Sequence, residues 1–122
     1  MVSTRFLTAR ITRYYRIKGY TVQREVKLGN CVVDLVATHP RTEEKVAVEV
    51  KASGDDLIRG LGQLAEALAW GFDQVILVTG LKESQSVALK VFAYHSFGLA
   101  GIDSRGALTW IVEPRSMKKG FL

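Results

Sequence analysis

Hydrophobic residues recur every three or four positions near the N-terminus, which is the spacing of a helix buried along one side. Residues 3–18 carry this pattern, with Leu7 and Ile11 on the apolar side. The hydroxyl of Ser3 or Thr4 can accept a hydrogen bond from a free backbone N–H, so either residue can cap the first turn. We therefore predict an amphipathic helix over residues 3–18.

The pattern then shortens to that of strands, in three segments separated by turn residues. These segments are residues 20–27, 31–38 and 45–51, and the second is apolar except for Asp34. Gly29–Asn30 separates the first two segments, and a short polar stretch separates the last two. Connections this tight favour an antiparallel meander of three strands.

Helices and strands alternate in the rest of the chain. A second helical pattern runs from a polar capping segment at residues 53–56 to about Trp70. Residues 74–79 are nearly all apolar, which is typical of a buried strand that a crossover helix places parallel to its neighbour. The remaining segments predict one helix and two short strands, over residues 83–97, 99–103 and 107–112.

These elements predict an α/β fold with a mixed central sheet, helices on both faces and an αβββαβ core. With 122 residues, 48% of them hydrophobic, the chain has the size of one domain and can bury a single core. We predict a single domain over residues 1–122, with a loose basic tail over residues 114–122.

Positive charge is concentrated at one end of the chain. The formal net charge is +5, yet residues 1–28 hold seven basic side chains against the single acid Glu25. A basic surface favours an anionic partner, most commonly nucleic acid. The alternative is that the basic residues are only the solvated side of the first helix. Our candidates for nucleic-acid contacts are Arg10, Arg13, Arg16, Arg24 and Lys27.

Composition excludes several other kinds of protein. No apolar run reaches the roughly 20 residues of a membrane-crossing helix, and arginines interrupt the apolar residues of the N-terminal segment, so we expect no signal peptide. Cys31 is the single cysteine, and with two histidines it is too little for a structural zinc site. We expect a cytoplasmic protein without a membrane partner, in which Cys31 is a plain buried thiol.

Two acids and a lysine carry the candidate chemistry. Because side chains alternate along a strand, Glu49 and Lys51 share one face and the valines between them share the other. If residues 31–38 and 45–51 pair as antiparallel neighbours, Asp34 lies opposite Glu49. A carboxylate within an apolar strand is costly unless it is paired or binds metal, and two adjacent carboxylates favour a hard divalent cation such as Mg²⁺ or Mn²⁺.

Each of these residues has a simpler interpretation. Asp34 can be a buried carboxylate that backbone N–H groups or Arg24 satisfy. Glu49 and Lys51 can be the solvated face of an amphipathic strand. Gly60 and Gly62 belong to a loose G-x-G-x-x-A pattern, but it does not directly follow a strand, so we interpret them as close-packing positions or a helix irregularity.

Asp34 followed by Glu49-Val50-Lys51, on the second and third strands of an αβββαβ order, resembles the PD-(D/E)XK nuclease superfamily, also called the restriction-endonuclease-like fold. The resemblance covers about two thirds of the chain, and the small basic form is most similar to archaeal Holliday-junction resolvases. It implies that Asp34, Glu49 and the Val50 carbonyl bind Mg²⁺ or Mn²⁺. It implies that Lys51 is the catalytic base or positions the attacking water.

The chain also departs from that family. Related members often carry an acid on the first helix that completes the metal site, but residues 3–18 contain none, and Glu25 is the nearest substitute. Gln63 resembles a glutamine that some branches carry on the following helix, although Ala67 stands where their tyrosine would be. We therefore include Glu25 and Gln63 among the candidate catalytic residues.

The resemblance and the charge together predict a Mg²⁺-dependent DNA endonuclease that selects branched structures. A branched substrate has two arms to cut, so we expect a homodimer, with Leu108–Val112 at a dimer edge. One alternative is a nucleic-acid-binding module of the same fold without catalysis, which the missing helix acid favours. Another is a structural or partner-binding domain with no nucleic-acid role.

Overall fold

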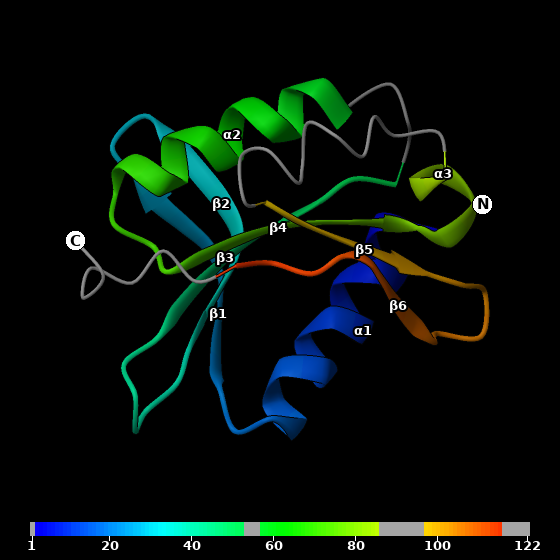
Figure 1. The fold of residues 1–122 in the computed structure, drawn as a ribbon, viewed down its shortest axis with the longest axis horizontal. Helices are drawn as coiled ribbons and strands as arrows, with labels where there is room; N and C mark the ends of the chain where they lie inside the picture. The colour runs from blue at the N-terminus through cyan, green and yellow to red at the C-terminus, as the bar shows by residue number, and fades with distance from the viewer. Residues whose placement is uncertain (1, 53–56, 86–96, 116–122) are drawn as a thin grey trace.

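A mixed sheet of six strands, in the order β1-β2-β3-β4-β5-β6, forms the centre of the computed structural model, which describes residues 2–52, 57–85 and 97–115. Figure 1 shows helix α1 and helix α2 on opposite sides of this sheet. The strands are β1 Thr21–Leu28, β2 Cys31–Thr38, β3 Lys45–Val50, β4 Gln74–Gly80, β5 Gly98–Ile102 and β6 Leu108–Val112. The α/β class and the mixed sheet with helices on both faces are confirmed.

Helix α1 (Thr4–Ile17) forms for the reasons that its sequence suggests. The Ser3 hydroxyl accepts a hydrogen bond from the backbone N–H of Phe6, so Ser3 is the capping residue. Leu7, Ile11 and Tyr15 are buried, at the spacing of one helix face. The chain leaves the helix through Gly19, whose φ of 91° a residue with a side chain rarely adopts.

The first three strands form the expected antiparallel meander. In β1 and β2, Thr21 pairs with Thr38 and Leu28 with Cys31, which closes a hairpin around Gly29. In β2 and β3 the pairing runs from Thr38 opposite Lys45 to Leu35 opposite Val48. This register places Asp34 and Glu49 directly after the last paired residues.

Strand β4 is parallel to β3, as its apolar run predicted. Helix α2 (Leu57–Ala69) makes the crossover and packs on β3 and β4. Strand β5 continues the sheet parallel to β4, and β6 turns back antiparallel to β5 and forms the edge. The sheet is therefore antiparallel at both ends and parallel in the middle.

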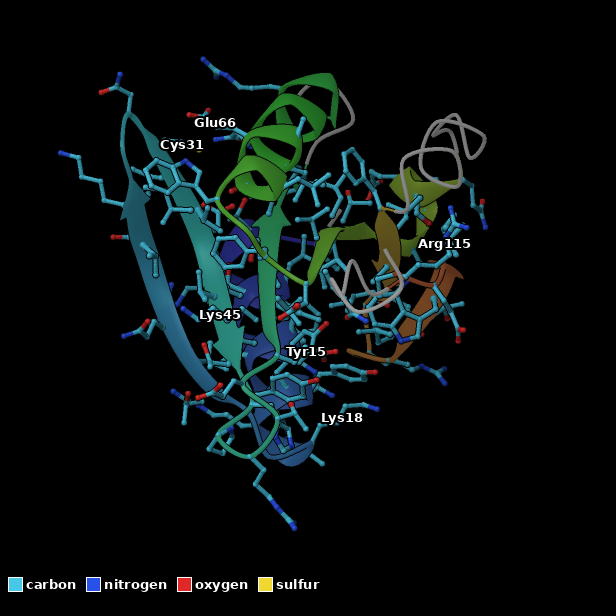
Figure 2. All side chains as sticks on the ribbon, turned by 60° about the vertical axis from the view of Figure 1, so that its left-hand side comes forward. Tyr15, Lys18, Cys31, Lys45, Glu66 and Arg115 are labelled. Atoms are coloured by element: carbon cyan, nitrogen blue, oxygen red, sulfur yellow. The ribbon has the colours of Figure 1, made fainter. Side chains whose placement is uncertain are left out.

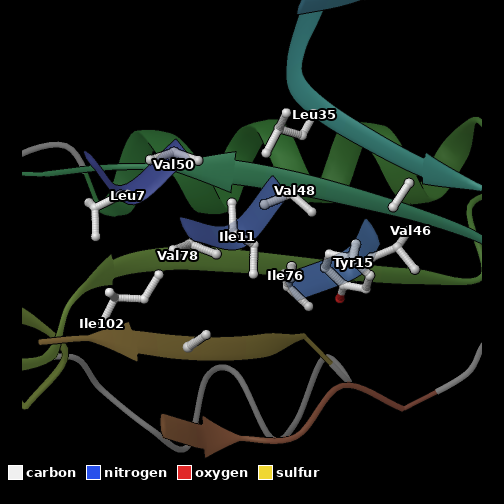
Figure 3. Packing of buried hydrophobic residues seen from close by; sticks show 12 residues of the cluster. Leu7, Ile11, Tyr15, Leu35, Val46, Val48, Val50, Ile76, Val78 and Ile102 are labelled. Carbon is white, nitrogen blue, oxygen red and sulfur yellow. The ribbon is translucent and has the colours of Figure 1, made fainter. Parts of the chain in front are cut away.

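Buried residues form two clusters, one on each face of the sheet. The cluster under α1 (Figure 3) takes alternate residues of β3, such as Val46, Val48 and Val50, which pack against Ile11 and its neighbours. The cluster under α2 takes the other alternate positions, including Ala47 with Leu64 and Leu77. Because both faces of the sheet are covered, the central strands are apolar on both sides.

The hairpin of β1 and β2 changes face halfway along. Val22 packs against the cluster under α1, whereas Val26 and Val33 belong with the cluster under α2. The change coincides with Glu25, whose φ of 53° interrupts the regular alternation of the strand. The tip of the hairpin consequently lies against α2, where a Cβ on Gly29 would come within 3.0 Å of the Trp70 ring.

Most differences from the predicted elements are small. The predicted helix over residues 83–97 falls largely on residues 86–96, which lie outside the described part of the chain. What the structure describes there is a short helix α3 (Leu81–Ser84), and Phe97 directly precedes β5. The predicted capping segment at 53–56 and the tail from 116 also lie outside the described residues. Among the described helices, none has the length and apolarity to cross a membrane.

Candidate active site

Asp34 and Glu49 meet where the backbone pairing of β2 and β3 stops. The backbone N–H of Asp34 donates to Glu49 Oε1 at 3.2 Å, and the backbone N–H of Val50 donates to Asp34 Oδ2 at 2.8 Å. Each carboxylate therefore takes the place of a backbone acceptor on the opposite strand. We call Asp34 and Glu49 the carboxylate pair.

Glu49 is almost completely enclosed. Its residue is 1% exposed, and its second oxygen, Oε2, has no hydrogen-bond partner among the described residues. The nearest cation is the Lys51 ammonium, whose Nζ lies 4.0 Å from Oε2. A buried carboxylate oxygen without a partner is costly, so this atom is ready to accept a cation or a proton.

The surroundings of Glu49 favour its protonated form. Burial, and after it the nearby Asp34 carboxylate, raise the pKa of Glu49 to about 8, although the backbone N–H of Asp34 and the Lys51 ammonium act in the opposite direction. A divalent cation would relieve both unfavourable effects, because it supplies positive charge where two acids repel each other. The donor set of the pair therefore fits a hard cation.

These contacts decide between the interpretations left open by the sequence. Glu49 is not on a solvated strand face, since it is buried. Asp34 does accept a backbone N–H, from Val50, as its simpler interpretation requires. Arg24 does not serve it, because Arg24 lines a groove beside α1 on the other side of the sheet.

Helix α2 covers the lysine of the site. A Cβ built on Gly60 would lie 3.4 Å from Lys51 Cγ and 2.9 Å from Leu77 Cδ1, so the glycine lets the helix approach both side chains. Gln63 follows three residues later on the same side of α2, and its Oε1 is buried without a hydrogen-bond partner in the described part of the chain. Gly60 is thus a close-packing position, as the sequence suggested.

Thr79 is a polar residue that sequence reasoning missed. It is fully buried near the end of β4, and its hydroxyl has no hydrogen-bond partner among the described residues. Alternation from Val75 and Leu77 places it on the α2 side of the sheet, the side of Glu49. The sequence does contain a signal for this residue, because Thr79 alternates with Val75 and Leu77, which face α2.

Glu25 does not join the carboxylate pair. The pairing of Arg24 with Leu35 and of Val26 with Val33 puts Glu25 opposite Asp34, but Glu25 is exposed and its backbone is left-handed. Within residues 2–52, 57–85 and 97–115, no three His, Cys, Asp or Glu side chains form a group able to hold a metal ion. The described site therefore offers two carboxylates and no third acid.

The basic residues predicted to bind nucleic acid separate into different places. Arg13, Arg16 and Arg24 line one groove of about 580 Å³ between α1 and β1. Arg10 points elsewhere, because its Nε donates to the Gly106 carbonyl at 3.2 Å. Lys27 is exposed on β1 and does not line that groove.

Cys31 is the buried thiol that the sequence suggested. It lies on β2 facing Glu66 of α2 (Figure 2), and burial raises the pKa of its thiol, with Glu66 adding to the effect. A thiol with a raised pKa is a poor nucleophile, so Cys31 contributes packing between the hairpin and the helix.

The fold is similar to that of several proteins of known structure. A protein of unknown function from Silicibacter pomeroyi matches 96% of this chain with a TM-score of 0.72 and 18% identity, and the chain covers 75% of it. A second protein of unknown function matches 81% of the chain (TM-score 0.61, 18% identity). A repair endonuclease from Pyrococcus abyssi matches 84% of the chain (TM-score 0.59, 15% identity).

At these identities the likeness concerns the fold. The chain spans 58% of the second protein and 48% of the endonuclease, about half of their lengths. No protein-family model and no curated protein matches the chain. The common architecture is that of a helix and a mixed sheet also used by a nuclease.

Proposed function

We propose that this chain is a metal-dependent endonuclease that hydrolyses phosphodiester bonds of DNA at the carboxylate pair and Lys51. The observation that carries the proposal is the meeting of three groups from β2 and β3. Asp34 and Glu49 are in mutual contact, and Lys51 Nζ lies 4.0 Å from Glu49 Oε2, which has no hydrogen-bond partner within the described part of the chain. The fold shared with a repair endonuclease supports this choice of chemistry.

Asp34, Glu49 and the backbone carbonyl of Val50 are the groups that would hold Mg²⁺ or Mn²⁺. Oxygen donors of this kind suit hard divalent cations. When bound, such a cation offsets the negative charge that develops on the phosphate during hydrolysis. The fit rests on Glu49 Oε2, which is buried without a hydrogen-bond partner among the described residues, and on the raised pKa of Glu49.

The protein groups hold their positions before substrate arrives. The backbone N–H groups of Asp34 and Val50 each fix one carboxylate oxygen, which leaves the second oxygen of each group outside these two hydrogen bonds. Lys51 is held by its packing against Gly60, so its ammonium can orient the attacking water and stabilise negative charge. Gln63 is a candidate for a further polar contact from α2, through its buried Oε1.

Branched DNA cut by a homodimer is part of this proposal. Cutting two arms of a branched DNA needs two active sites, one on each of two copies of the chain. A two-fold symmetric dimer supplies both. Strand β6 is an edge of the sheet that the described residues form, and an edge strand is where a second copy could pair.

A cleavage assay with Mg²⁺ or Mn²⁺ on linear, flap and four-way DNA tests the proposal. Lys51→Ala and Asp34→Asn are expected to lower the cleavage rate on the order of a hundred-fold to a thousand-fold, because each removes a group that stabilises transition-state charge. Lys82→Ala is the matched control, since it removes a lysine that is exposed on α3. Its rate is expected to equal that of the wild type.

Two results would contradict the proposal in different ways. Cutting that persists in both Lys51→Ala and Asp34→Asn would mean that another site carries the reaction. Binding of DNA without any cutting by the wild-type protein would instead favour the non-catalytic module. The absence of a third acid near the pair in the described residues is the observation that favours that second function.

A further inference from the structure

Four arginines line a groove on the side of the sheet that α1 covers. Arg5, Arg13 and Arg16 come from one face of α1, and Arg24 comes from β1 across the groove. The groove has a volume of about 580 Å³, and its other lining residues are Thr8, Ala9, Thr12 and Ile17. We call this feature the arginine groove.

The four guanidinium groups are available for an external anion. Within residues 2–52, 57–85 and 97–115, none of the four has a hydrogen bond or an ion pair, and no acid lines the groove. Thr12 also has a buried hydroxyl with no hydrogen-bond partner there. Like charges gathered without counter-charges repel each other, so an anion in the groove would stabilise the arrangement.

The arginine groove and the carboxylate pair lie on opposite faces of the sheet. Helix α1 packs on the face that carries Val48 and Val50, whereas Glu49 points to the face under α2. Figure 1 shows the sheet between the two helices. The groove and the carboxylate pair therefore lie on different sides of the sheet, with the edge strand β1 carrying Arg24.

We propose that the arginine groove binds the sugar-phosphate backbone of a second DNA segment, separate from the segment at the carboxylate pair. This inference rests on the proposed function and extends it. It specifies how a branched substrate would be held, with one arm at the carboxylate pair and another in the groove, because a molecule that occupies both faces must reach around the sheet. Arg5, which the sequence analysis had not selected, belongs to this surface, and Arg10 does not.

The length of the groove matches a polymer better than a single small anion. Arg5 and Arg16 are separated by about 16 Å along the axis of α1, which corresponds to roughly five phosphates of one DNA strand. Guanidinium groups bind phosphate oxygens through paired hydrogen bonds, which favours a row of phosphates. A membrane surface fits less well, because the apolar face of α1 is already buried on the sheet.

Binding measured in EDTA, where no metal-dependent cutting occurs, tests the groove apart from catalysis. Fluorescence anisotropy with a four-way junction and a linear duplex would compare the wild type with Arg13→Gln/Arg16→Gln. We expect junction binding to weaken about ten-fold or more, and the slope of log K against log salt to fall by about two. Linear duplex binding should weaken less, because the duplex can occupy the other face.

Two control pairs make the result specific to the groove. Arg41→Gln/Lys82→Gln removes the same charge from exposed residues outside the groove, and should change junction binding less than two-fold. Arg13→Lys/Arg16→Lys keeps the charge but loses the paired hydrogen bonds, so its junction binding should lie between that of the wild type and that of Arg13→Gln/Arg16→Gln. The proposal would be overturned if Arg13→Gln/Arg16→Gln and Arg41→Gln/Lys82→Gln weakened junction binding equally. It would also be overturned if Arg13→Gln/Arg16→Gln weakened junction binding and duplex binding equally.

Other outcomes separate this inference from the proposed function. The inference would fail if the wild type bound phosphatidylserine vesicles and Arg13→Gln/Arg16→Gln lost this binding but kept junction binding. A membrane would then replace DNA as the ligand of the groove. If the wild-type protein never cut DNA but Arg13→Gln/Arg16→Gln still lost junction binding, the endonuclease proposal would fail. DNA binding by the arginine groove would still be supported. Circular dichroism of each variant confirms that it is folded.

Discussion

Burying the carboxylate of Glu49 is unfavourable for the folded protein. It is buried beside another carboxylate, and its one nearby cation, Lys51, is 4.0 Å from an oxygen that lacks a hydrogen bond within the described residues. A residue that served only stability would be better replaced here by an apolar or neutral side chain. Under the proposed function, a bound cation would offset this cost.

This cost predicts a pH-dependent stability. Glu49 has a pKa of about 8 in the folded protein, against an ordinary value of 4.5. The folded state binds this proton more tightly, so the stabilisation is complete below pH 4.5 and is lost as the pH rises through about 8. In EDTA, the free energy of unfolding measured with urea should fall across this interval.

Glu49→Gln is the matched variant, because its amide oxygen can still accept the Asp34 N–H. It should remove most of the fall with pH. It should also abolish the rise in Tm that the proposed function predicts when Mn²⁺ is added to the wild type. A wild-type stability that is constant from pH 4.5 to 8 would show that Glu49 is not held at a raised pKa.

At the scale of elements, α2 contains two glycines in different surroundings. Gly60 faces Lys51 and Leu77, whereas a Cβ on Gly62 would have nothing within 4 Å. Glycine inside a helix costs about 0.5–1 kcal/mol relative to alanine. The absence of a side chain at Gly60, which carries this cost, allows α2 to approach Lys51 closely.

The two glycines give a matched pair of substitutions. Gly62→Ala should increase the free energy of unfolding by about 0.5–1 kcal/mol and leave cleavage unchanged. Gly60→Ala should gain no stability, since its Cβ would meet Leu77 at 2.9 Å. By displacing Lys51 it should also lower the cleavage rate on the order of ten-fold to a hundred-fold. Urea unfolding and the cleavage assay measure the two effects, and equal behaviour of both variants would contradict this account of α2.

At the scale of the whole molecule, Arg10 joins the two ends of the described chain. It donates from α1 to the carbonyl of Gly106, in the turn between β5 and β6. Gly106 has a φ of 90°, and a side chain there would run into the Arg10 guanidinium. Trp110 of β6 makes a second link, through its Nε1 to the Tyr14 hydroxyl at 3.2 Å. Two hydrogen bonds between residues far apart in sequence therefore link α1 to the segment of β6 and the turn before it.

This arrangement predicts different consequences for two neighbouring arginines. Arg10→Ala should lower the free energy of unfolding by about 1.5 kcal/mol, because it removes a charge-assisted hydrogen bond and leaves a carbonyl unpaired. Arg13→Ala, at an exposed position, should change it by less than about 0.5 kcal/mol. Urea denaturation of both variants provides the comparison, and a larger loss for Arg13→Ala would contradict it.

The sequence by itself determined the order of the described elements and most of their bounds, and it selected Asp34, Glu49 and Lys51 as candidate site residues. Those properties depend on local periodicity, capping and turn residues, which act between near neighbours in the chain. Strand β2 over Cys31–Thr38 and the parallel β4 follow from apolar runs alone. Antiparallel pairing through a short turn then brings Asp34 close to Glu49.

Only the tertiary structure decided which side chains share a surface. Alternation along a strand does not report the left-handed backbone at Glu25, so the removal of this acid from the pair could not be foreseen. Helix periodicity likewise places Arg10 and Arg13 on one basic side, but contact with Gly106 occupies one and leaves the other in the groove. Burial depends on segments far apart in sequence that pack together, and so does the lack of a hydrogen-bond partner, among the described residues, for Glu49 Oε2 and the Thr79 hydroxyl. Local patterns carry no information about that packing.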